Sequence, residues 1–320
     1  MKKQLFSFII AGLFITPVEA ETVFISLEKD NAIAVVDPIE GTLSKTVEVG
    51  RRPRGIALSP DNKVIYVAVS DDNVIKMLDA ESLQELGTLP SGDDPETFAL
   101  NPKGDRIYIS NEDDSMVTAV DIAKKKTIKN IKVGVEPEGI AVSPDNRWVV
   151  SASETTNMLH WIDTKTHEIT ENTLVDTRPR ALTFTGDSKF VWATSEMAGS
   201  LMILDTATKQ IVKRVGFEIP GVAKDKIQPV GVVVDKANKH GYVALGTANR
   251  IAVVNARTHE VEKYLLVGQR VWNLAFSPDQ KRLYTANGVS NDMSIIDLEN
   301  LTVTKSVGVG NYPWGVAVKP

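Results

Sequence analysis

Short apolar runs separated by polar turns recur along this chain in one fixed order. The clearest copy begins at Pro137. Its first turn is Ser143-Pro144-Asp145-Asn146, a composition typical of tight turns. A polar loop at 153–157 and a second turn that begins at Asp163 divide the rest of the copy. No run keeps a helical period, so the pattern predicts four short β-strands, at Gly139–Val142, Trp148–Ala152, Met158–Ile162 and Glu168–Leu174.

This four-strand unit repeats seven times. The anchor before the first strand has a spacing of 42 residues except for one step of 50, at Pro53, Pro95, Pro137, Pro179, Pro229, Val271 and Pro313. A second anchor has the same period, at Asp37, Asp79, Asp121, Asp163, Asp205, Asn255 and Asp297. A period of about 40 to 45 residues is typical of a propeller blade. The sequence therefore predicts an all-β, seven-bladed propeller of four-stranded antiparallel blades.

The two ends of the repeat array complement each other. Residues 22–49 hold three strands of a repeat, and residues 314–318 hold one first strand. We expect the N-terminal three strands to pair with the C-terminal strand and close the ring, which would leave no open sheet edge. Eight extra residues around 217–222 should project from the face that carries the second-to-third strand loops and the blade connections. Because loop variation on a rigid scaffold often marks binding, we expect any function on that face.

Residues 1–20 have the pattern of a signal peptide. Lys2 and Lys3 precede an apolar run at 5–15, and Val18-Glu19-Ala20 resembles a cleavage site. The sequence predicts export, cleavage after Ala20 and one propeller domain at 21–320. The chain has no cysteine, which excludes disulfides and thiol chemistry. Its net charge of −5 gives no basic footprint for nucleic acid.

The residues on either side of each anchor should surround the mouth of the central channel. In ring order these positions are Arg52/Arg54, Asp94/Glu96, Glu136/Glu138, Arg178/Arg180, Gln228/Val230, Arg270/Trp272 and Tyr312/Trp314. Two interpretations remain open. The arginines and acids of neighbouring blades could neutralise one another. Alternatively, they could form a recognition surface in which arginines bind carboxylates and the aromatic residues provide flat faces.

Polar residues of the second-to-third strand loops could join this mouth. They are Glu28, Asp30, Asn31, Asp71, Asp72, Glu112, Asp113, Asp114, Glu154, Glu196, Asn287 and Asn291. None of these acids has the ligand spacing of an EF-hand, so no metal site is predicted. The four histidines have no recognisable ligand spacing, and no G-x-S-x-G motif occurs. No catalytic residue is therefore predicted, although an enzyme is not excluded.

The repeat G-x-x-P-x-G-[IV]-A-[VL]-S-P-D resembles that of the YVTN-type β-propellers. Several segments are also similar to exported propellers associated with pyrroloquinoline-quinone (PQQ)-dependent catabolism, including GRRPRGIALSPD from Gly50, SETTNM from Ser153, FEIPGV from Phe217 and NYPWGV from Asn311. The resemblance implies a periplasmic protein but no established catalytic residues. It does not imply a PQQ dehydrogenase, because the Trp-bearing repeat of those enzymes is missing here.

The leading hypothesis is a non-catalytic binding or scaffold protein whose channel rim docks a periplasmic partner. That partner would be a quinoprotein dehydrogenase, a cytochrome or an ABC-transporter component. One alternative is a carrier of a small anionic ligand such as PQQ. The other is a lactonase-like hydrolase that uses Glu136 or Glu138 at the channel mouth.

Overall fold

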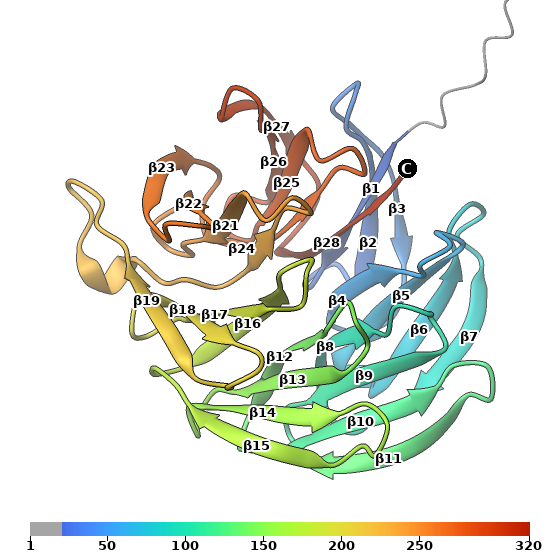
Figure 1. Cartoon of the computed structure of the whole chain (residues 1–320). Coiled ribbons are helices and arrows are strands. Elements are labelled where there is room, and N and C mark those ends of the chain that lie inside the picture. The colour runs from blue at the N-terminus through green and yellow to red at the C-terminus, as the bar shows by residue number, and fades with distance from the viewer. Residues whose placement is uncertain (1–20) are drawn as a thin grey trace, which may run out of the picture.

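Seven four-stranded antiparallel sheets surround a central axis in the computed structural model, which describes residues 21–320 (Figure 1). We number the blades in chain order. Blades 1 to 3 comprise β4 (Pro53–Leu58), β5 (Val64–Val69), β6 (Val74–Asp79) and β7 (Glu85–Pro90); β8 (Pro95–Leu100), β9 (Arg106–Asn111), β10 (Met116–Asp121) and β11 (Lys126–Lys132); and β12 (Pro137–Val142), β13 (Trp148–Ser153), β14 (Met158–Asp163) and β15 (Ile169–Leu174).

Blades 4 to 6 follow the same order. They comprise β16 (Pro179–Phe184), β17 (Phe190–Ser195), β18 (Ser200–Asp205) and β19 (Ile211–Gly216); β20 (Val232–Val234), β21 (His240–Ala244), β22 (Arg250–Asn255) and β23 (Val261–Leu266); and β24 (Val271–Phe276), β25 (Arg282–Asn287), β26 (Asp292–Asp297) and β27 (Thr302–Gly308). Only two short 3₁₀ turns, Ser70–Asp72 and Lys224–Lys226, interrupt the strands within residues 21–320. The predicted all-β seven-bladed propeller is confirmed.

Blade 7 joins the two ends of the propeller. Its strands are β28 (Pro313–Lys319), β1 (Thr22–Leu27), β2 (Ala32–Asp37) and β3 (Thr42–Glu48). β28 is antiparallel to β1, with Val318 opposite Val23 and Ala317 opposite Phe24 (Figure 1). The predicted ring closure is therefore confirmed. Residues 1–20, where the signal peptide is predicted, lie outside the described residues.

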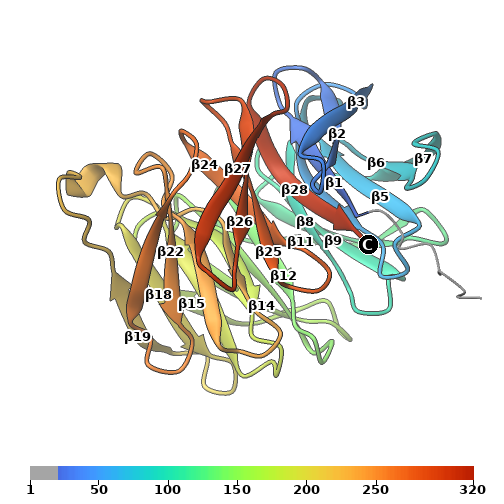
Figure 2. The ribbon, with the colours of Figure 1, turned by 90° about the horizontal axis from the view of Figure 1, so that it is seen from above.

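The blades pack face to face, and this packing explains the apolar runs. The second and third strands of most blades are buried almost throughout, as in β5, where Ile65 to Val69 are all buried. Both faces of these strands contact neighbouring blades, so the apolar residues are consecutive rather than alternating. The outermost strands, such as β11 with the sequence KTIKNIK, are mostly exposed and polar. Figure 2 shows the tilted blades stacked around the axis in this way.

The recurring aspartates stabilise the third-to-fourth strand turns. The Asp163 carboxylate accepts backbone N–H bonds from Lys165 at 2.8 Å and Thr166 at 3.0 Å. Asp79 and Asp205 make the same type of contact in their blades. At Asp205, hydrogen bonds to the ionised carboxylate hold the pKa below its usual range. The aspartates of the second anchor therefore recur because each one stabilises the turn in which it lies.

The innermost strands approach one another closely around the axis. The residue two positions after the anchor meets a backbone carbonyl of the next blade. A Cβ on Gly231 would lie 2.6 Å from the Trp272 oxygen, and one on Gly315 would lie 2.7 Å from the Arg54 oxygen. A Cβ on Gly139 would overlap the Arg180 oxygen. Glycine at these positions therefore lets neighbouring inner strands come together.

Blade 5 departs from the regular repeat. Its inner strand is only three residues long, and Pro229 precedes it instead of starting it. Phe217, Ile219 and Ile227, from the longer connection, are buried in the core between blades 4 and 5. The extra residues thus contribute to packing and shorten the inner strand. Within residues 21–320, no helix has the length and apolar character needed to cross a membrane.

Replacing Gly139 by alanine should destabilise the ring, because the new methyl group cannot fit against the Arg180 carbonyl. We expect a loss of about 1–3 kcal/mol, the usual cost of overpacking a well-packed site. Gly308→Ala is the control, since a Cβ there meets no atom within 4 Å. Urea unfolding of both variants measures the difference. Equal stabilities would contradict the close approach at the axis.

Candidate functional site

The residue before most anchors has an unusual backbone conformation, and several of these residues place their side chains over the channel. Arg52, Asp94 and Arg178 have φ values of 54°, 51° and 60°, in the left-handed region. A non-glycine residue there costs of order 1 kcal/mol, so other contacts must hold it. One such contact comes from an asparagine of the preceding blade. Asn31 accepts the Arg52 N–H at 3.0 Å, and Asn157 accepts the Arg178 N–H at 2.9 Å.

One half of the channel mouth is an ion-pair network centred on Glu96. This carboxylate is fully buried and accepts hydrogen bonds from Arg52 at 2.6 Å and from Arg54 at 2.7 Å. Arg52 also binds Asp94 at 2.6 Å, and Arg54 lies 3.5 Å from Glu28. Both arginines of blade 1 are therefore bound to carboxylates of blade 2, and Arg54 also lies near a carboxylate of blade 7.

The other half is centred on Arg180, which is also buried. Its guanidinium binds two carboxylates of blade 3, Glu138 on the inner strand β12 and Glu154 in the loop after β13. Arg178 lies above it, 2.9 Å from Glu154 and 3.2 Å from Glu196. Because a buried charge without partners costs several kcal/mol, these carboxylates are what allow Arg180 to be buried.

Arg270 links distant blades across this network. It lies on blade 6 but binds Glu196 of blade 4 at 2.8 Å and Gln228 at 2.7 Å. Its guanidinium also lies over the Trp272 ring, 3.9 Å from the centroid. Trp272 therefore contributes a cation–π contact to the same mouth.

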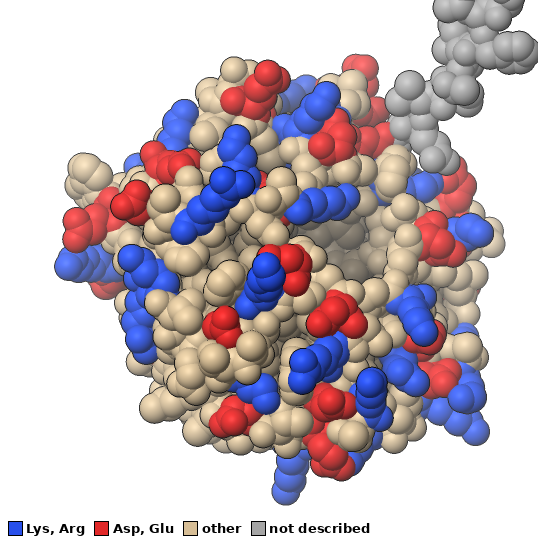
Figure 3. All heavy atoms as spheres, in the orientation of Figure 1, with Lys and Arg blue, Asp and Glu red and all other residues tan. Residues whose placement is uncertain are grey.

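These side chains surround a cavity of about 540 Å³, which we call the mouth cavity. It is lined by Arg52, Arg54, Glu112, Glu138, Arg178, Arg180, Glu196, Met197, Gln228, Thr247, Arg270 and Trp272. Figure 3 shows a hollow near the middle of the ring and charges of both signs mixed over the face in view. Neither sign forms a large patch in this view, which does not suit a polyanion such as nucleic acid.

Three carboxyl groups of the mouth, those of Glu96, Glu112 and Glu138, have a raised pKa, and burial is the largest cause in each case. Burial, followed by the charges of Glu96 and Asp94, raises the pKa of Glu112 to about 8. Burial likewise raises the pKa of Glu138 well above its usual range. The Glu96 carboxylate is held by two arginines, so Glu112 is the member of that pair that keeps the proton at neutral pH.

Asp94, Glu96 and Glu112 are the one acidic group among the described residues with carboxylate oxygens close enough to share an ion, within 4.8 Å of one another. Arg52 and Arg54 already bind two of these carboxylates, however, and the third retains a proton. As arranged, this group is part of the ion-pair network.

Not every predicted rim residue lies at the mouth cavity. Glu136 turns aside and accepts a hydrogen bond from Thr155. Tyr312 is 44% exposed on the same face, near Lys29. Trp314 is only 4% exposed and lies deeper in the channel. The predicted loop acids Glu112 and Glu196 do line the cavity.

Sequence reasoning did not single out Met197, Thr247, Thr97 or Asn273. The first two line the mouth cavity, and the last two line the channel below it. A signal for the last two exists in the repeat: the position two residues after the anchor is Gly or Ala in five blades but Thr97 and Asn273 in the others. Both donate to the next blade's carbonyl, Thr97 to Glu138 and Asn273 to Trp314 at 3.1 Å.

None of the four histidines lines the two channel cavities. His160 bonds to Ser153, Asn172 and the Gly134 N–H within its blade. The hydroxyl that lines the mouth cavity, Thr247, donates to the Lys226 carbonyl at 2.7 Å. No nucleophile-and-base pair is therefore assembled at the mouth within residues 21–320.

Comparison with known proteins shows a partial family match. Residues 63–179 match the cytochrome D1 heme domain family, which is a β-propeller family. The match spans about a third of the chain. No curated protein matches the chain significantly.

Solved propeller structures share the fold at low sequence identity. Hydrazine synthase of Kuenenia stuttgartiensis is 21% identical, with a TM-score of 0.74, over 83% of this chain and 89% of that one. A protein of Bacteroides uniformis ATCC 8492 proposed to be a 6-phosphogluconolactonase is 16% identical, with a TM-score of 0.77, over 94% of this chain and all (100%) of that one. Dihydro-heme d1 dehydrogenase NirN is 13% identical, with a TM-score of 0.65, over 89% of this chain and 63% of that one.

The family match raises the question of whether the channel suits a haem-like tetrapyrrole. Haem iron is commonly held by His, Cys, Met or Tyr. Met197 is the one such residue lining the mouth cavity, and it is 63% exposed. The surrounding carboxylates would also repel the acidic side chains of a tetrapyrrole. The residues present do not fit such a group.

The raised pKa of Glu112 predicts a pH-dependent stability. The folded protein keeps this proton up to about pH 8, whereas a carboxyl group in the unfolded chain loses it near its ordinary pKa of 4.5. The contribution of Glu112 is therefore fully present below about pH 4.5 and is lost as the pH rises towards 8. The amide of Glu112→Gln carries no titrating proton, so the variant should become more stable relative to the wild type between pH 5 and 8.

Denaturant unfolding at pH 5, 6.5 and 8 measures this difference. Glu171→Gln, on the mostly exposed outer strand β15, is the control and should follow the wild type. A constant difference between Glu112→Gln and the wild type would show that Glu112 is ionised throughout this range.

Proposed function

We propose that this chain is an exported, non-catalytic binding protein that docks a periplasmic protein partner on its mouth face. The observation that carries the proposal is the saturation of the mouth arginines by the protein's own carboxylates. Arg52, Arg54, Arg178, Arg180 and Arg270 all have acidic partners. A surface neutralised in this way is better suited to broad contact with a protein than to capture of a free anion.

Exposed apolar side chains on the same face support this proposal. Val135, Met197, Val289 and Tyr312 are 45%, 63%, 51% and 44% exposed. They come from loops and connections of different blades, and Met197 is the one of the four that lines the mouth cavity. Aromatic residues and methionine are enriched at protein interfaces. A partner that covers the mouth could contact several of them at once.

The expected class of partner depends on the resemblance of several segments to PQQ-associated propellers. It would be a quinoprotein dehydrogenase, a cytochrome or an ABC-transporter component. The predicted signal peptide at 1–20 supports the same location, since it would direct export. The partial match to a haem-domain family is compatible with a redox setting but supports no ligand in this chain.

The alternative of an anionic ligand such as PQQ is less well supported. Its three carboxylates would have to displace Glu96, Glu154 or Glu196 from the arginines that bind them. The lactonase alternative draws on two structural neighbours proposed to be 6-phosphogluconolactonases, at 16% identity. At that identity the likeness concerns the fold alone. Loss of lactone turnover in Glu138→Gln would be needed to support it.

A photo-crosslinking residue in place of Tyr312 should trap the partner in intact cells. The same residue in place of Ile39, which is 60% exposed in the third-to-fourth strand turn of the opposite face, is the matched control. We expect one discrete crosslinked product at 312 and none at 39, identified by mass spectrometry. The same product from both positions, or none from 312, would contradict docking on the mouth face.

PQQ added to the purified protein should not bind saturably at micromolar concentration, because every mouth arginine is already paired. Tryptophan fluorescence is a suitable signal, since Trp272 lies against Arg270 at the mouth. Calorimetry gives an independent measurement. Saturable micromolar binding that is lost in Arg178→Ala/Arg180→Ala would instead make this chain a carrier of an anionic ligand.

A further inference from the structure

A second cavity of about 150 Å³ lies in the channel and shares Glu138, Arg180 and Trp272 with the mouth cavity. We call it the deep cavity. Much of its lining is aliphatic and comes from four inner strands or the residues just before them: Ile140, Leu182, Val230, Val232 and Leu274. An apolar cavity of about 150 Å³ is large enough for one benzene-sized ring.

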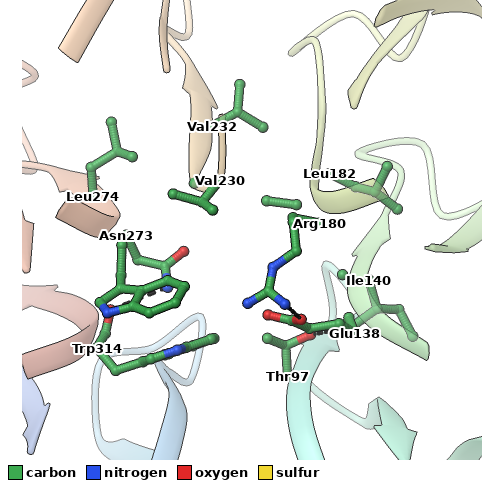
Figure 4. Close-up of a pocket in the computed structure, with 14 residues that line it drawn as sticks. Thr97, Glu138, Ile140, Arg180, Leu182, Val230, Val232, Asn273, Leu274 and Trp314 are labelled. Atoms are coloured by element: carbon green, nitrogen blue, oxygen red, sulfur yellow. Dashed lines mark hydrogen bonds and ion pairs between the residues drawn. The ribbon is translucent and has the colours of Figure 1, made fainter. Parts of the chain in front are cut away.

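Two indoles form one side of the deep cavity. Trp314 and Trp272 line it together, and Figure 4 shows Trp314 approaching from the side opposite Arg180. The Trp272 ring is also held by guanidinium groups, with Arg270 at 3.9 Å and Arg180 at 5.6 Å from its centroid. An indole fixed in this way can contact a flat apolar molecule at little further entropic cost.

The polar atoms without partners beside this cavity are donors. The Trp314 indole N–H is buried and has no hydrogen-bond acceptor within residues 21–320. The Arg180 Nε–H likewise makes no hydrogen bond, and its nearest carboxylate oxygen, on Glu196, is 3.7 Å away. A buried donor without an acceptor costs about 1–3 kcal/mol. A molecule with an acceptor oxygen could remove part of this cost.

The charges around the cavity favour an uncharged molecule. Arg180 already binds Glu138 and Glu154, as the dashed line to Glu138 in Figure 4 illustrates. A second anion would therefore compete with these carboxylates at short range and in a setting of low dielectric. A carbonyl oxygen can accept a hydrogen bond without adding a charge.

We propose that the deep cavity binds a small, uncharged aromatic molecule that carries a carbonyl oxygen. The ring lies against Trp272, Trp314 and the aliphatic side chains, and the oxygen accepts a hydrogen bond from the Trp314 indole. This site is separate from the docking surface, whose exposed contacts Tyr312 and Val289 do not line the deep cavity.

The test follows the indole N–H signals of the ¹⁵N-labelled protein while acetophenone is added. The chain has five tryptophans, so five such signals are expected, and Trp314→Phe identifies the relevant one by removing it. We expect this signal to shift downfield and saturate, because the N–H gains an acceptor. The Trp161 signal is the reference, since its N–H already donates to Thr173 at 3.0 Å.

Benzoate has the same ring with a charged carboxylate, and we expect it to bind at least about tenfold more weakly than acetophenone. Trp314→Phe retains a ring but no N–H, so the Trp272 signal should show weaker acetophenone binding in that variant. If the variant does not fold, Leu274→Trp, which fills the cavity from another strand, should abolish the shift of the Trp314 signal.

Three results would overturn the proposal. An unchanged Trp314 signal would mean that only solvent occupies the cavity. Equal shifts of Trp314 and Trp161 would indicate non-specific binding. Tighter binding of benzoate than of acetophenone would exclude an uncharged ligand as the preferred class.

Discussion

The close approach of the inner strands around the axis is the constraint on which the rest of this structure depends. Each anchor is followed, two residues later, by a position that meets a carbonyl of the next blade. Glycine fills it at Gly139, Gly231 and Gly315, where a side chain would collide with that carbonyl. The residue between anchor and glycine must then project its side chain into the channel, which is how Glu138, Val230 and Trp314 reach the channel cavities. The chemistry of the channel therefore follows from a packing requirement.

The same constraint explains why the charges of the mouth occur as a network. Side chains that project inward from seven blades lie near one another and away from bulk water, so each arginine needs a carboxylate from a neighbouring blade. Where blade 5 is shortened, no charged side chain projects from its own inner strand, and Arg270 reaches past it to Glu196 of blade 4. The Arg270–Glu196 ion pair thus joins blades 4 and 6 across the irregular blade 5. Five arginines and seven acids cannot all be ionised at neutral pH without excess negative charge, and the proton on Glu112 reduces that excess.

The sequence period predicted the fold well because a propeller repeats one local unit, the four-stranded blade, along the chain. The third strand of blade 3 was expected at 158–162 and is Met158–Asp163, and the second was expected at 148–152 and is Trp148–Ser153. The exception is blade 5, where Pro229 does not begin a strand, because the inserted residues pack Phe217 and Ile227 into the core. The depth of a side chain in the channel could not be predicted in the same way. Tyr312 and Trp314 flank the same proline, yet Tyr312 is 44% exposed and Trp314 is buried. The left-handed backbone does not explain this, because Arg52, Arg178 and Arg270 share it and line the mouth cavity.

This difference in depth distinguishes the two kinds of recognition that we propose for this channel. At the mouth, the guanidinium and carboxylate groups form ion pairs with one another, so a partner would gain little by breaking these pairs. Its affinity would have to come from contacts with the exposed side chains around them. In the deep cavity, the Trp314 indole N–H and the Arg180 Nε–H are buried without acceptors from the described part of the chain. A small molecule that supplies an acceptor there would gain the free energy of a new hydrogen bond. Arg180, Glu138 and Trp272 belong to both levels. A ligand that moves Arg180 in the deep cavity would alter its contacts with Glu138 and Glu154, and through them the charge arrangement that a docked partner meets.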